Sequence, residues 1–142
     1  MEIWLLGNKD LAIDNLPLKL KKKLQKEFPE FEFFEISYIE NEESIPRPLV
    51  IIDTVQGIDK VKLFRDIKEF RKNPSITMHD LDVHSQLLFL DKLKKLPSHI
   101  LIFGLPQNSE ADEVLPDLIF SLRSNLPSKN VTRNSYKDHK PE

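Results

Sequence analysis

Three side chains that can bind a divalent metal ion stand close to apolar stretches of the sequence. Asp14 comes shortly after the apolar run Ile3–Leu6, and Asp53 directly follows the apolar run 49–52. His79 lies in a polar stretch just ahead of an apolar-periodic segment. Two carboxylates and one imidazole suit a borderline ion such as nickel, zinc or manganese, and they leave coordination positions open for a substrate.

Each of these residues also has a purely structural interpretation. For Asp53, a role in capping a turn explains its position as well as a functional role does. Asp14 is a residue type that often caps a helix N-terminus, and Pro17 suits the first turn of such a helix. His79 can form a hydrogen bond to the backbone. The sequence therefore leaves both interpretations open for each position.

The other polar residues around His79 have simpler explanations. Asp80 and Asp82 are expected to start a helix, because acidic residues are favoured at the N-cap and in the first turn. His84 falls inside that helix, and His99 lies at the entrance of a strand. Both histidines are expected to be structural or solvated.

Composition excludes several other chemistries. The chain has no cysteine, so thiolate metal sites, disulfides and cysteine nucleophiles are absent. Its three glycines permit neither a GxGxxG motif nor a P-loop. A formal charge of −2 gives no argument for nucleic acid or an anionic membrane. The first residues lack the features of a signal peptide, and no apolar run approaches membrane-spanning length, so a cytoplasmic protein without membrane insertion is expected.

The hydrophobic pattern alternates between strands and helices. Short apolar runs predict strands, and apolar residues spaced three or four apart predict helices. The expected strands are 3–6, 31–38, 49–52 and 100–104, and the expected helices start near 17, span 82–96 and include 115–126. The region 57–73 fits either a strand or a helix. This alternation predicts a three-layer α/β/α sandwich around a mostly parallel twisted sheet.

The composition changes near the end of the chain. After Leu126 the sequence is rich in Lys, Asn, Ser and Asp and has almost nothing apolar. Residues 1–126 are therefore expected to form a single domain, and residues 127–142 a disordered tail.

Four segments together resemble the endopeptidases that mature nickel–iron hydrogenases. "LLGNKDLAIDN" resembles the opening strand and its Gly-Asn loop, "LVIIDTV" the central strand, "ITMHDLDV" the segment that leads into a helix, and "ILIFGLPQ" the strand after it. The segments occur in the family's order and at similar spacing, over residues 3–107.

The resemblance implies a particular activity and site. Such enzymes remove a C-terminal extension from the hydrogenase large subunit precursor once nickel has been inserted. Asp14, Asp53 and His79 match the family's metal-binding positions and would grip the substrate's nickel, so no stored cofactor is expected. These metal-site residues are also the candidates for catalysis, since nothing identifies a nucleophile. The resemblance further favours a strand at residues 60–65.

The sequence departs from the family at three places. Ile13 stands where a second acid is usual, and Pro17 stands where a glycine is usual. The Gly-Thr-Ala-Gly type of loop after the second strand is replaced by Ser37-Tyr38-Ile39-Glu40-Asn41. A non-catalytic, metal-binding assembly factor related to these peptidases is therefore the alternative to an active peptidase.

Overall fold

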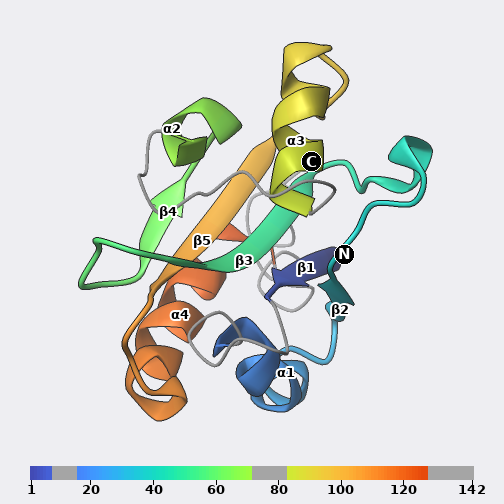
Figure 1. The fold of residues 1–142 in the computed structure, drawn as a ribbon. Coiled ribbons are helices and arrows are strands. Elements are labelled where there is room, and N and C mark those ends of the chain that lie inside the picture. Colours follow the sequence, from blue (N-terminus) through green and yellow to red (C-terminus); the bar gives the residue numbers. More distant parts are fainter. Residues whose placement is uncertain (8–15, 72–82, 128–142) are drawn as a thin grey trace, which may run out of the picture.

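The computed structural model of the chain describes residues 1–7, 16–71 and 83–127, and these form alternating strands and helices (Figure 1). The strands are β1 (Glu2–Leu6), β2 (Glu32–Ile36), β3 (Leu49–Val55), β4 (Lys62–Phe64) and β5 (Ile100–Pro106). The helices are α1 (Leu16–Glu27), α2 (Ile67–Arg71), α3 (Val83–Lys92) and α4 (Ala111–Asn125), with a short 3-10 helix at Glu42–Ser44.

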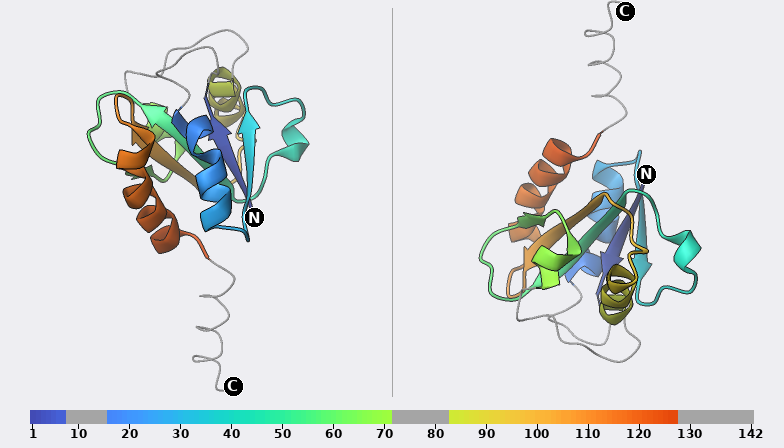
Figure 2. Two further views of the ribbon diagram at one scale, coloured as in Figure 1. Left: turned by 90° about the horizontal axis from the view of Figure 1, so that it is seen from below. Right: turned by 90° about the horizontal axis from the view of Figure 1, so that it is seen from above.

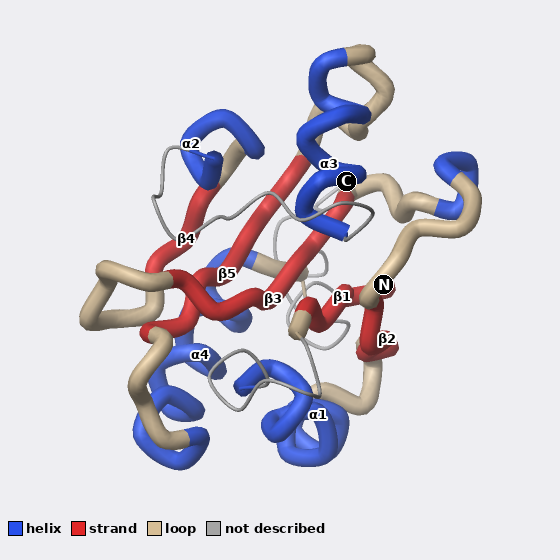
Figure 3. Tube along the Cα trace, in the orientation of Figure 1, coloured by secondary structure: helices blue, strands red, loops and turns tan. Residues whose placement is uncertain are grey.

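The strands form one five-stranded sheet in the order β2-β1-β3-β5-β4 (Figure 3). Neighbouring strands are parallel except at one edge, where β4 runs antiparallel to β5. From β1 the chain moves outward to the edge strand β2 and then returns to β3 on the other side of β1. The strand order therefore reverses between β1 and β3, and sites in such sheets form beyond the carboxyl ends of the strands at this point.

Helices cover both faces of the sheet, which gives three layers. Helices α1 and α4 lie on one face, and α2 and α3 lie on the other (Figure 2). Side chains alternate along the central strands, so Ile3 and Leu5 of β1 face α1 and α4, whereas Trp4 and Leu6 face the opposite layer. The structure confirms the α/β sandwich with a mostly parallel sheet that the sequence predicts.

The ambiguous region after Gly57 contains one strand and one helix. Lys62–Phe64 forms β4, and Ile67–Arg71 forms the short helix α2. The strand expected near residues 60–65 is confirmed, and the helical spacing of Ile67 and Phe70 places both side chains in the core.

Helix α3 ends earlier than the sequence predicts. The sequence suggested a helix that continues to residue 96 and stops at Pro97, but α3 ends at Lys92. Lys94 adopts a left-handed conformation with φ of 58°, and the N–H of Lys95 donates to the carbonyl of Leu90 at 2.9 Å. This is the pattern of a Schellman motif, in which the left-handed residue is more often glycine.

The predicted tail lies almost entirely outside the described residues, which end at residue 127. Helix α4 ends at Asn125, and the N–H of Leu126 donates to the carbonyl of Leu122 at 2.9 Å. The division between a domain and a disordered tail stays a prediction. Within residues 1–7, 16–71 and 83–127, no helix is long and apolar enough to cross a membrane.

Candidate metal-binding site

Asp53 lies in the central strand β3, close to its carboxyl end. The sequence placed Asp53 immediately after the strand, whereas β3 continues through Thr54 to Val55. Asp53 pairs in register with Gly104 of β5. Because alternate residues of a strand share a face, the Asp53 side chain points to the same layer as Ile51 and Val55, which is the layer of α2 and α3.

The carboxyl group of Asp53 is almost completely buried. Its exposed fraction is 4%, and among the described residues it is the one charged side chain in the buried class. The N–H of Thr54 donates to Oδ1 at 2.9 Å, and Nε2 of His84 lies 2.6 Å from Oδ2. Removing a carboxylate from water is costly unless hydrogen bonds or an opposite charge compensate, and these two contacts supply such compensation.

His84 reaches Asp53 from the first turn of α3, which begins at Val83. Its side chain is 27% exposed and stacks on the ring of Phe70 in α2, with ring centroids 6.4 Å apart and planes at 20°. From the sequence, His84 was expected to be structural or solvated, because nothing in the pattern shows that it meets a carboxylate 31 positions away. His99, by contrast, is exposed, as the sequence predicts.

Asp14 and His79 lie outside the described residues, and so do Asp80 and Asp82. Their predicted roles as metal ligands and helix starters are therefore not tested by the geometry. Asp14 belongs to the connection that leaves β1, the strand next to β3, and His79 belongs to the connection that enters α3. In the part of the chain that the structure describes, no three His, Asp or Glu side chains gather into a group that could hold a metal ion.

The loop after β2 is held against α3 by two hydrogen bonds. The side chain of Gln86 accepts from the N–H of Ile39 at 2.7 Å and donates to the carbonyl of Ile39 at 2.8 Å. Ile39 itself is buried, with 7% exposure. A single amide group thus satisfies both backbone groups of one loop residue, as a neighbouring strand would.

Comparison with known proteins places the fold. No protein-family model matches the sequence, and no curated protein matches it at the level of sequence. Among solved structures, the chain is similar to the hydrogenase maturating endopeptidase HybD from E. coli, with 16% identity, 87% of this chain and 93% of that chain covered, and a TM-score of 0.56. An uncharacterized protein from Wolinella succinogenes is also similar, with 15% identity, 74% and 72% coverage, and a TM-score of 0.47.

The described residues thus show the fold class of the chain and one buried contact. The chain has an α/β fold like that of HybD, with a buried aspartate close to the carboxyl end of the central strand and a histidine bonded to it. At 16% identity the likeness concerns the fold, so the activity has to be argued from the site.

Proposed function

We propose that the protein is an endopeptidase that removes the C-terminal extension of a nickel-loaded hydrogenase large subunit. In this proposal Asp14, Asp53 and His79 bind the substrate's nickel and thereby sense that the metal has been inserted. The nickel arrives as part of the substrate, so the enzyme needs no metal of its own between turnovers. Bound between the two proteins, it would place the scissile bond close to a Lewis acid.

The observation that carries the proposal is the position of Asp53. A buried carboxylate stands on the central strand beside the point where strand order reverses, in a fold similar to a hydrogenase maturating endopeptidase. Carboxylate oxygen and imidazole nitrogen are suitable ligands for a borderline divalent ion. The buried carboxylate of Asp53 therefore fits a nickel ion presented by a partner.

Recognition through the ion explains how loaded and empty precursors would be told apart. The coordination bonds from this chain form only when the precursor carries its metal, so an empty precursor lacks that part of the binding energy. Discrimination then results from a difference in affinity between two forms of one protein. The same coordination bonds also speed the cleavage of loaded precursor, provided that they are strongest in the transition state.

The test is a mass measurement of the precursor after incubation with the full chain. Nickel-loaded precursor should lose its extension, and nickel-free precursor should stay intact even at high enzyme concentration. Asp14→Ala, Asp53→Ala and His79→Ala should each abolish or sharply slow the cleavage. His99→Ala is the matched control, since His99 is exposed and lies outside the site. Cleavage of the empty precursor would contradict nickel sensing.

The loop after β2 favours a second function, that of a non-catalytic assembly factor which binds a metal-loaded partner. The loop lacks the Gly-Thr-Ala-Gly type of sequence, and Gln86 holds its Ile39 against α3. An assembly factor would bind the nickel-loaded large subunit more tightly than the empty one and leave the mass of both unchanged. A partner subunit without a cleavable extension would point the same way.

A further inference from the structure

His84 contacts Asp53 but is not among the proposed ligands Asp14, Asp53 and His79. We infer that His84 binds the divalent ion together with Asp53, through Nε2 and Oδ2, so that the two side chains form a ready-made pair of metal ligands. The inference rests on the proposed function for the identity of the ion as nickel. It extends that function by adding a ligand that comes from helix α3.

The first support is the distance between the two donor atoms. Nε2 of His84 and Oδ2 of Asp53 are 2.6 Å apart. Bonds from such ions to imidazole nitrogen and carboxylate oxygen are about 2.0–2.2 Å long, which puts two neighbouring ligand atoms about 3 Å apart. Separation by a few tenths of an ångström would thus admit the ion. An ion bound to Oδ2 would therefore have Nε2 of His84 as its neighbouring donor.

The second support is that each of the two side chains is held in place by its surroundings. Asp53 is part of the central strand, and its Oδ1 is fixed by the N–H of Thr54. His84 is fixed from the opposite side by its stacking on Phe70. Ligands held before the ion arrives lose little conformational freedom on binding, and this raises affinity.

The third support is that solvent reaches the pair on the side of His84. Asp53 is buried, whereas the side chain of His84 is 27% exposed. An ion presented by a partner protein can therefore approach the pair past the imidazole. On binding, the ion takes the place of the hydrogen between the two atoms. In a neutral ring the displaced hydrogen moves to Nδ1 through solvent exchange, and in a charged ring the Nε2 proton is released to solvent while the hydrogen on Nδ1 stays.

A purely positioning role is the alternative, in which His84 only orients the carboxylate. The substitution His84→Gln separates the two roles, because glutamine keeps an N–H donor at a similar reach but its amide is a poor ligand for a borderline ion. His84→Ala removes both functions. His99→Ala serves as the control for loss of an unrelated imidazole, since its side chain is exposed.

The experiment titrates the full chain with zinc, a diamagnetic ion of the same class, and follows the histidine ring nitrogens by NMR. The signal that disappears in His84→Gln identifies His84. Zinc should move the Nε2 signal of His84 to the position of a metal-bound imidazole. Both His84→Gln and His84→Ala should weaken zinc binding at least about tenfold. His99→Ala should bind like the unaltered chain.

Three results would overturn the inference: an Nε2 signal of His84 that does not move at millimolar zinc, unaltered affinity in His84→Ala, or full affinity in His84→Gln. The precursor assay keeps this outcome apart from the proposed function. If nickel-dependent cleavage requires Asp53 and is indifferent to His84, the peptidase proposal stands and the inference fails. If His84 and Asp53 bind zinc and no precursor is ever cleaved, the ligand pair stands and the peptidase proposal fails.

Discussion

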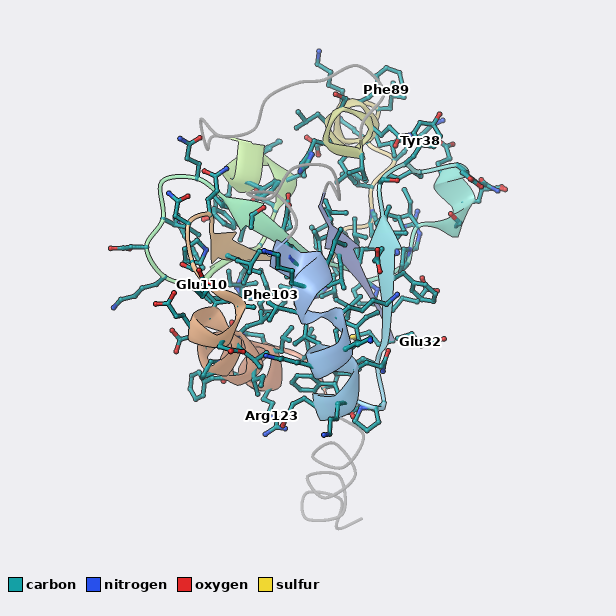
Figure 4. All side chains as sticks on the ribbon, turned by 60° about the horizontal axis from the view of Figure 1, so that its bottom comes forward. Glu32, Tyr38, Phe89, Phe103, Glu110 and Arg123 are labelled. Carbon is teal, nitrogen blue, oxygen red and sulfur yellow. The ribbon has the colours of Figure 1, made fainter. Side chains whose placement is uncertain are left out.

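The two faces of the sheet are packed by different kinds of side chain. Under α1 and α4 the buried layer is apolar throughout the described residues, and Phe103 lies between the sheet and these helices (Figure 4). The charged groups of these helices stay at the surface, where Lys23 pairs with Asp112 and Arg123 pairs with Glu27. Under α2 and α3 the apolar layer includes the buried carboxyl group of Asp53 and its partner His84.

Under the proposed function, the two faces of the sheet have different roles. Apolar burial stabilises a fold in proportion to the area removed from water, so the layer under α1 and α4 needs no further explanation. A buried carboxylate bonded to a histidine is weak evidence for stability, because the loss of hydration offsets much of what the contact contributes. In the proposed function, Asp53 is retained because it binds the metal ion.

The largest expected effect is on activity and comes from Asp53→Asn. The amide keeps an acceptor for the N–H of Thr54, so the free energy of unfolding should change by less than about 2 kcal/mol. Cleavage of nickel-loaded precursor should fall by at least about a hundredfold, because a neutral amide is a poor replacement for a carboxylate ligand. Denaturant unfolding and the precursor mass measure the two quantities. A stability loss of more than about 3 kcal/mol would make Asp53 a structural residue.

Leu118→Ala should show the opposite profile. Leu118 of α4 is fully buried under the apolar face. Its truncation should lower the free energy of unfolding by about 2–5 kcal/mol, because the loss of apolar burial adds to the cost of a cavity. Zinc affinity, measured well below the unfolding temperature, should be unaltered. A variant with weakened zinc binding and intact stability would break the comparison between the faces.

Substitutions of two glutamines, one on each side of the sheet, allow a direct comparison of the two faces. Gln86 of α3 bonds to the backbone of Ile39, and Gln25 of α1 donates to the carbonyl of Phe31 at 2.7 Å. Gln86→Ala and Gln25→Ala should each cost about 1–3 kcal/mol, because each leaves a partly buried backbone group without its partner. Only Gln86→Ala should also alter precursor binding, since its loop lies on the side of α3. Equal binding by both variants would remove the loop from substrate recognition.

A chain that ends at Leu126 should fold almost as stably as the full chain. The residues after Leu126 offer almost nothing apolar to bury, so nothing offsets the entropy lost on ordering them. The expected loss in the free energy of unfolding is below about 2 kcal/mol, because larger losses require a specific packing mechanism. A larger loss would show that residues 127–142 contribute to the apolar face that α4 covers.

The smallest effect is expected for Lys23→Ala. Lys23 pairs with Asp112 across α1 and α4, but the two side chains are 50% and 81% exposed. Exposed ion pairs contribute about 0–1 kcal/mol, and salt screens them further. Unfolding at low salt should show this small difference, and at high salt the difference should shrink towards zero. Precursor cleavage should be unaltered. Any loss of cleavage would show that the surface of α1 and α4 also takes part in the function.

Much of the fold was predictable from short-range pattern. Ile3–Leu6 and the run 49–52 are apolar at every position, which is typical of strands covered on both faces, and both are buried. The spacing of Leu20 and Leu24 places the buried side of α1. The end of α3 was not predictable, because Lys94 adopts a left-handed conformation for which its residue type gives no signal.

For the site, the sequence supplied the candidate ligands Asp14, Asp53 and His79. The tertiary structure revealed the contact between Asp53 and His84. Residue type and position directly after an apolar run made Asp53 a candidate metal ligand, because carboxylate oxygen suits a divalent ion and sites form at the carboxyl ends of parallel strands. That His84 compensates it depends on α3 packing over β3, which joins two residues 31 positions apart. Local periodicity shows which side of a helix is apolar, but it does not show which strand that helix will cover. The sequence by itself thus determined the layers and offered Asp53 as a candidate, and only the packing of α3 over the sheet decided that Asp53 is buried beside a histidine.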